Sequence, residues 1–131
     1  MSEIYIYERF MPDTLLGEWQ ETLDSKLHAQ WNEMFGDHPS DGAARAAGLA
    51  VACMMRAYLG VVSPRPPGNI HARQVVTLHN LPELGEVIRS RVWCRDKEMR
   101  RERRHLTIEV IGSGHENRPL YTGRMGLIWA R

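Results

Sequence analysis

The stretch from Ala43 to Leu59, AARAAGLAVACMMRAYL, decides the fold because it is a helix-forming run with only two charged residues. Those residues, Arg45 and Arg56, fall on nearly the same face of a helix that turns about 100° per residue. The rest of the helix surface is apolar or small, so other parts of the chain must cover it. We therefore expect this run to be the central helix of the domain.

The segments around this helix have the character of strands. The breaker SPRPPG at 63–68 ends the helix, and four segments of alternating apolar and polar residues follow it. These segments are 70–78, 86–95, 104–112 and 119–130. Upstream, the pattern predicts a strand over 15–23 and a short amphipathic helix over 25–35. One buried helix followed by a run of strands predicts an α+β domain in which one curved antiparallel sheet covers the helix.

Length and composition place the chain among ordinary globular domains. It has 131 residues, a formal net charge of +1 and 25% charged residues, so we expect a single domain over 1–131 and neither a nucleic acid nor a membrane as partner. The longest apolar stretch, 43–62, carries two arginines and is too polar to span a bilayer. The first residues, MSEIYIYERF, lack the apolar run of a signal peptide, so a cytoplasmic protein is expected. Cys53 and Cys94 are expected to be buried free thiols rather than a disulfide pair.

Two short motifs and the order of elements resemble the MaoC-like dehydratases, which include the (R)-specific enoyl-CoA hydratases. Residues 67–74, PGNIHARQ, are similar to the PG-x-I-x-x-x-Q stretch of that family, and residues 81–86, LPELGE, are similar to its segment ending in Gly-[Asp/Glu]. The resemblance covers roughly residues 13–130. It implies the hotdog fold, in which one curved antiparallel sheet wraps a long central helix.

The resemblance also implies a substrate class and a position for it. Acyl-CoA or acyl-carrier-protein thioesters bind in a groove along a dimer interface, with the thioester carbonyl at the N-terminal end of the central helix. Free backbone N–H groups and the helix dipole stabilise an oxyanion at such a position. By its place in the motif, the N–H of Gly48 is the expected donor. The alternative is that Gly48 only lets the helix pack closely on the sheet.

The catalytic motif of the family, D-x-N-P-x-H, has only a partial counterpart here. The corresponding stretch is Gly-Asp-His-Pro-Ser-Asp at 36–41, which keeps Asp37 and Pro39 in outline but lacks the Asn. When the two are aligned on the proline, Asp41 stands at the histidine position. Ala47 replaces the histidine that precedes the helix glycine in the family.

Three interpretations of this loop stay open. In the first interpretation, Asp37 and His38 form a rearranged acid/base pair. In the second interpretation, Asp37 or Asp41 alone positions a water for thioesterase chemistry. In the third, the loop only caps and ends helices, as Asp, Ser and Gly often do.

Other candidates are weaker. His71 lies one residue off the apolar face of 70–78, where it either faces solvent or reaches a groove or another subunit. Arg73 lies in the same motif, and we count His71, Arg73, Asp41 and Ala47 as candidate substrate contacts. The basic stretch 95–104 either binds the phosphates of CoA or an acidic carrier protein, or is a solvated hairpin. The sequence has no HExxH, CxxC or carboxylate cluster, so neither a metal nor another cofactor is expected.

Together these observations predict a homodimer or higher homo-oligomer, since pairing of exposed sheet edges removes their unpaired backbone groups. The first expected function is an acyl-thioester hydratase or dehydratase with a degenerate catalytic motif. The alternatives are a catalytically silent subunit that binds an acyl-thioester, or an acyl-CoA thioesterase.

Overall fold

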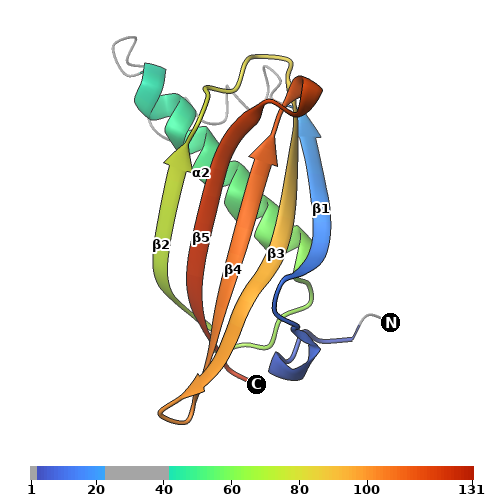
Figure 1. Cartoon of the computed structure of the whole chain (residues 1–131), viewed down its shortest axis with the longest axis vertical. Coiled ribbons are helices and arrows are strands. Elements are labelled where there is room, and N and C mark those ends of the chain that lie inside the picture. The colour runs from blue at the N-terminus through green and yellow to red at the C-terminus, as the bar shows by residue number, and fades with distance from the viewer. Residues whose placement is uncertain (1–2, 23–41) are drawn as a thin grey trace.

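The computed structural model describes residues 3–22 and 42–131, which form one five-stranded sheet with one long helix across it (Figure 1). The strands are β1 (Thr14–Thr22), β2 (Ile70–Leu78), β3 (Val87–Arg100), β4 (Arg103–Ser113) and β5 (Pro119–Trp129). The helix is α2 (Gly42–Val61), and two short 3-10 turns are η1 (Tyr7–Arg9) and η3 (His115–Asn117). The predicted helix over 25–35 lies outside the described residues.

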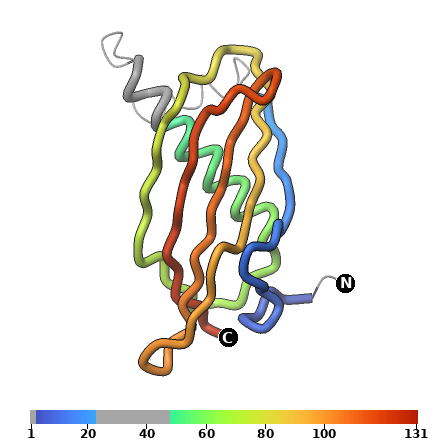
Figure 2. The backbone as a smooth tube through the Cα atoms, viewed as in Figure 1, coloured from blue at the N-terminus to red at the C-terminus, as the bar shows by residue number. Residues whose placement is uncertain are grey.

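The sheet has the strand order β1-β3-β4-β5-β2, and every neighbouring pair is antiparallel. Strands β1 and β2 are therefore its two edges. Helix α2 crosses one face of the sheet and contacts all five strands (Figure 2). This confirms the predicted α+β architecture of one antiparallel sheet around one helix.

The core lies between α2 and the sheet, and the predicted alternation of β3, β4 and β5 is confirmed. The inward residues of these strands are 3% exposed or less: Ile88, Ser90, Val92, Cys94, Leu106, Ile108, Val110, Tyr121, Met125, Leu127 and Trp129. The helix faces them with Leu49, Ala50, Cys53, Met54, Ala57 and Tyr58, spaced three and four apart as one helix face requires. Both cysteines are buried and free, as expected.

The β3–β4 hairpin is longer than predicted. The charged stretch after Arg95 is paired backbone rather than loop, and the turn consists of Arg101 and Glu102, with φ angles of 51° and 64°. Such two-residue hairpin turns favour Asn and Gly, and neither occurs here. No local sequence pattern therefore indicated where this turn lies. The paired arm projects beyond the rest of the sheet (Figure 1).

The N-terminal segment closes the end of the sheet near the C-terminus. Phe10 is fully buried and packs edge-on against Trp129 at 5.2 Å between ring centroids. The indole Nε1 of Trp129 donates a hydrogen bond of 2.6 Å to the carbonyl of Tyr5. Within the described residues, no helix is long and apolar enough to cross a membrane.

Candidate functional site

The residues predicted to carry the chemistry fall mostly at or before the start of α2. Asp37, His38 and Asp41 lie outside the described residues. Ala47 belongs to α2, but its side chain is outside the described part. Gly48 is half-buried and lies six residues after the first residue of α2. Only the first four N–H groups of a helix lack intrahelical acceptors, so the Gly48 N–H lies beyond them. Its role as an oxyanion donor stays a prediction.

A β-bulge places His71 and Arg73 on opposite faces of the sheet. His71 is opposite Leu127 and Arg73 is opposite Gly126, so Ala72 is an extra residue in the β2–β5 ladder. Directly opposed residues share a face of the sheet, and Leu127 points into the core. His71 therefore faces the helix side, whereas simple alternation predicted that it lay off the apolar face. Both residues still border the open recess along the β2 edge.

His71 lines a groove of about 290 Å³ between α2 and β2. The helix contributes Tyr58 and Leu59, the sheet contributes Ile70 and Leu127, and the connecting loop supplies the remaining wall. Leu59 is 42% exposed and Ile70 is 51% exposed, which is high for large apolar side chains. The groove thus has mixed apolar and polar walls, with a histidine and a tyrosine among them, and it opens at the edge of the sheet.

Arg65 holds the wall of this groove in place at the C-terminal end of α2. Its Nη1 donates hydrogen bonds of 2.9 Å to the carbonyl of Leu59 and 2.7 Å to the carbonyl of Val62. These contacts satisfy carbonyl groups that a helix end leaves free, and they place a cation at the negative end of the dipole. Burial raises the pKa of Tyr58, against the opposing charge of Arg65, so the phenol stays protonated and able to donate.

A second polar cluster lies between α2 and β1. Arg56 donates from Nε and Nη2 to the two carboxylate oxygens of Glu21, at 2.9 and 2.7 Å, and the indole of Trp19 adds a bond of 3.2 Å. Burial raises the pKa of Glu21, but these hydrogen bonds outweigh it and the net shift is downward. Burial and Glu21 raise the pKa of the Cys53 thiol to about 12. An ionised, fully engaged carboxylate and a protonated thiol make this cluster structural rather than catalytic.

The second family-like motif, residues 81–86, has a structural explanation. Glu86 is 2% exposed and accepts hydrogen bonds from the backbone N–H groups of Glu83 at 3.0 Å and His115 at 3.1 Å. Arg118 forms an ion pair with the same carboxylate. Glu86 thereby ties the loop before β3 to the turn before β5. Among the described residues, no group of three or more His, Cys, Asp or Glu side chains is placed to hold a metal ion.

The groove residues Tyr58 and Arg65 were not anticipated from the sequence. A cation just after an apolar helix is a known signal for a C-terminal cap, and it could have indicated Arg65. Tyr58 carries no such signal, because its spacing within the helix is that of a core residue. The Glu21–Arg56 pair joins residues distant in the chain, and no local pattern connects them.

Comparison with solved structures identifies the fold. The unliganded (R)-hydratase PhaJ1 of Pseudomonas aeruginosa matches with a TM-score of 0.74 and 14% identity, over 94% of this chain and 84% of that one. A MaoC-like dehydratase from Rhodospirillum rubrum matches with a TM-score of 0.76 and 13% identity, over 95% and 96%. The truncated HadBC (3R-hydroxyacyl-ACP dehydratase) complex of Mycobacterium tuberculosis matches with a TM-score of 0.70 and 11% identity, over 89% and 96%.

No protein-family model and no curated protein sequence matches the chain. At these identities the structural likeness shows the fold alone. The chain has the hotdog fold, and its structural neighbours include MaoC-like dehydratases and (R)-hydratases, which confirms the resemblance found in the sequence.

Proposed function

We propose that this chain is an acyl-thioester hydratase or dehydratase of the MaoC-like type, with a rearranged catalytic motif. The observation that carries the proposal is the groove between α2 and edge strand β2, in a fold shared with (R)-hydratases and a MaoC-like dehydratase. The exposed apolar side chain of Leu59 in this groove suits an acyl chain. Acyl-CoA and acyl-carrier-protein thioesters are the proposed substrates.

The chemistry needs one proton donor and one acceptor around a water molecule. In hydration, the base takes a proton from water while the oxygen attacks the β-carbon, and the acid then delivers a proton to the α-carbon. Asp37 and His38 are the proposed pair. The negative charge that develops on the thioester oxygen needs free backbone N–H groups, which α2 offers in its first turn, before Gly48. His71 and Tyr58 are proposed to orient the substrate along the groove.

The proposed assembly is a homodimer formed through the β2 edges. Ile70 to Val75 are exposed along this edge, and Val75 is 61% exposed. An unpaired strand of this length is normally covered or paired. Because the groove opens at the same edge, a second copy of the chain would close it.

The direct test is turnover of crotonyl-CoA, followed by loss of the absorbance of the conjugated enoyl thioester. We expect turnover by the wild type and a fall of at least about a hundredfold in Asp37→Asn and His38→Ala, the usual size of a general acid or base contribution. Arg89→Gln, an exposed change on strand β3, is the matched control and keeps its activity. Undiminished turnover in both site variants would refute the assigned pair. Release of free thiol without hydration would instead indicate a thioesterase.

A catalytically silent thioester-binding subunit is the second candidate. It is favoured by the missing Asn and His of the family motif, and by the neighbouring HadBC structure, which is a complex. This candidate predicts no turnover of crotonyl-CoA together with a rise in melting temperature on addition of the thioester. Turnover by the purified chain would exclude it.

A further inference from the structure

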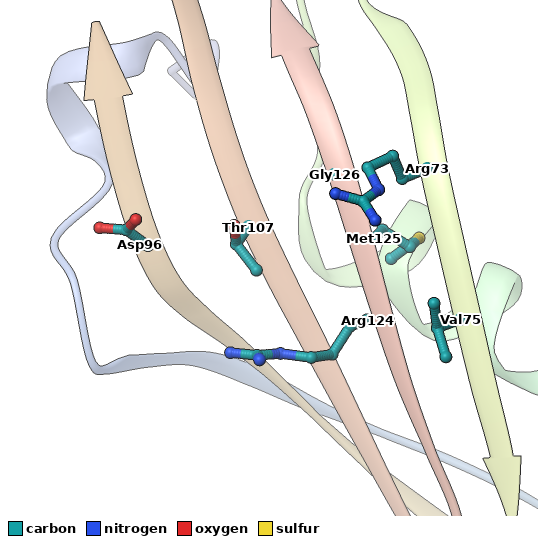
Figure 3. Close-up of a pocket in the computed structure, with 7 residues that line it drawn as sticks. All are labelled: Arg73, Val75, Asp96, Thr107, Arg124, Met125 and Gly126. Atoms are coloured by element: carbon teal, nitrogen blue, oxygen red, sulfur yellow. The ribbon is translucent and has the colours of Figure 1, made fainter.

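The outer face of the sheet, opposite α2, carries a hollow of about 480 Å³ (Figure 3). Its floor is a row of directly opposed residues, one from each of four strands. In spatial order across the sheet, this row consists of Asp96, Thr107, Gly126 and Arg73. The hollow therefore lies on the other side of the sheet from the groove, and its function goes beyond the one proposed above.

Gly126 creates the depression because it contributes no side chain between two rows of larger residues. The aliphatic part of Arg73 lies over it, at distances of 3.4 to 3.7 Å from where a Cβ on Gly126 would stand. Figure 3 shows the Arg73 side chain extending across β5 toward Thr107. Arg73 takes this outward orientation by regular alternation with Gln74 and Val75, whereas the bulge at Ala72 reverses His71.

Beside the hollow, the other arginines are engaged by carboxylates. Glu109 accepts a hydrogen bond of 3.0 Å from Arg95 Nε and forms an ion pair with Arg124 Nε at 3.2 Å, and Arg95 also lies 3.7 Å from Asp13. Within the described part of the chain, no carboxylate lies within ion-pair distance of Arg73. Asp96, the other acid of the hollow, stands three strands away from Arg73, about 14 Å at ordinary strand spacing.

We propose that this hollow binds a phosphate group, held by the Arg73 guanidinium with Arg124 and the Thr107 hydroxyl as further donors. A planar guanidinium presents two parallel N–H groups to phosphate, and a second cation nearby raises the affinity. The volume lies within the range of small-molecule sites. Because the hollow is on a face of the sheet rather than on its edge, pairing of β2 edges leaves it open.

The test is a titration of the isotope-labelled protein with inorganic phosphate, followed by the amide resonances of Thr107 and Gly126. We expect saturable shifts in the wild type and about tenfold weaker binding in Arg73→Gln, the loss expected for one charge-assisted contact. Arg91→Gln, an outer-face arginine paired with Glu18 at 3.8 Å, is the matched control and keeps the wild-type affinity. Absence of saturable shifts would overturn the proposal, as would equal shifts with chloride at the same ionic strength or unchanged affinity in Arg73→Gln.

A second titration distinguishes the two sources of such a phosphate. Adenosine 3′,5′-bisphosphate carries the phosphates of the CoA nucleotide. Tighter binding of this compound than of inorganic phosphate, with the same dependence on Arg73, assigns the hollow to a nucleotide. Equal affinities assign it to free phosphate or to small phosphate esters.

Discussion

His71 and Arg73 face opposite sides of the sheet although one residue separates them, because Ala72 is an extra residue in the ladder between β2 and β5. In a regular strand, residues two apart share a face. The bulge therefore gives one short motif two surfaces, with a histidine in the groove beside α2 and an arginine in the outer hollow.

This arrangement predicts selective cross-linking. Leu59 and His71 line the same groove, so a short bismaleimide should join the two cysteines of the variant Leu59→Cys/His71→Cys within one chain. It should not join those of Leu59→Cys/Arg73→Cys, because the sheet separates them. Peptide mass spectrometry measures the product, and the wild type is the control, since Cys53 and Cys94 are at most 1% exposed. Equal cross-linking of both variants would contradict the bulge.

The buried carboxylate of Glu86 predicts acid-sensitive stability. Burial raises its pKa, but the N–H groups of Glu83 and His115 and the charge of Arg118 outweigh this, so the folded-state pKa lies below the ordinary 4.5. As the pH falls, the unfolded chain therefore binds the proton at a higher pH than the folded chain does. The contribution of ionised Glu86 to the free energy of unfolding is present above the unfolded-state pKa and is lost as the pH falls through the folded-state pKa. We expect Glu86→Gln to lower the free energy of unfolding by about 2 kcal/mol at neutral pH. The difference from the wild type should shrink as the pH falls below 4.5.

Urea denaturation at several pH values measures both effects. Glu83→Gln is the control, because the Glu83 side chain is exposed and only its backbone contacts Glu86. A loss of stability in Glu86→Gln that does not change with pH would mean that packing, rather than charge, is responsible.

The hydroxyl groups of Ser90 and Tyr121 predict a strongly non-additive pair. They lie 2.6 Å apart, and both side chains are 1% exposed. Removing one hydroxyl leaves the other buried without its partner, at a cost of about 1–3 kcal/mol, whereas removing both leaves no unpaired group. Ser90→Ala/Tyr121→Phe should therefore be less destabilised than the sum of its single variants, as determined by chemical denaturation. Additive losses would show that the hydrogen bond contributes nothing beyond its separate groups.

The same core explains why most of the fold could be predicted from the sequence. In β3, β4 and β5 one face packs against α2, so residues such as Val92 and Ile108 must alternate with polar ones. The length of α2 also followed from local composition, because few charged residues interrupt its apolar run. These features are set by neighbours in the chain.

The features that were missed depend on contacts between distant segments. The bulge at Ala72 leaves no mark on the alternation of 70–78, and it reversed the expected orientation of His71. A hairpin was expected over the charged stretch around Arg101, but the length of its paired strands was missed because backbone pairing does not depend on charge. The Glu21–Arg56 pair forms only when β1 lies beside α2. The groove needs α2, β2 and β5 together, so no single motif could indicate it.

The free edge of β2 predicts opposite outcomes for proline at two adjacent positions. In an antiparallel edge strand, the N–H groups of consecutive residues point alternately to the neighbouring strand and outward. Of Val75→Pro and Val76→Pro, one therefore removes a bond to β5, and the other removes only an outward N–H group. We expect the variant that loses the bond to β5 to unfold or to lose much of its stability. The variant that loses only the outward N–H group should keep the circular dichroism spectrum of the wild type but elute as a monomer, if two copies pair through β2.

Light scattering after gel filtration reports the mass, with Val75→Thr as a control that keeps its N–H group. Amide hydrogen exchange of the wild type gives an independent measurement that requires no variant. Along β2, a dimer paired at this edge protects consecutive amides, whereas a monomer protects only alternate ones. A folded proline variant that remains dimeric, or alternate protection in a dimeric wild type, would place the contact between copies elsewhere, and the groove beside His71 would then be open in the assembly.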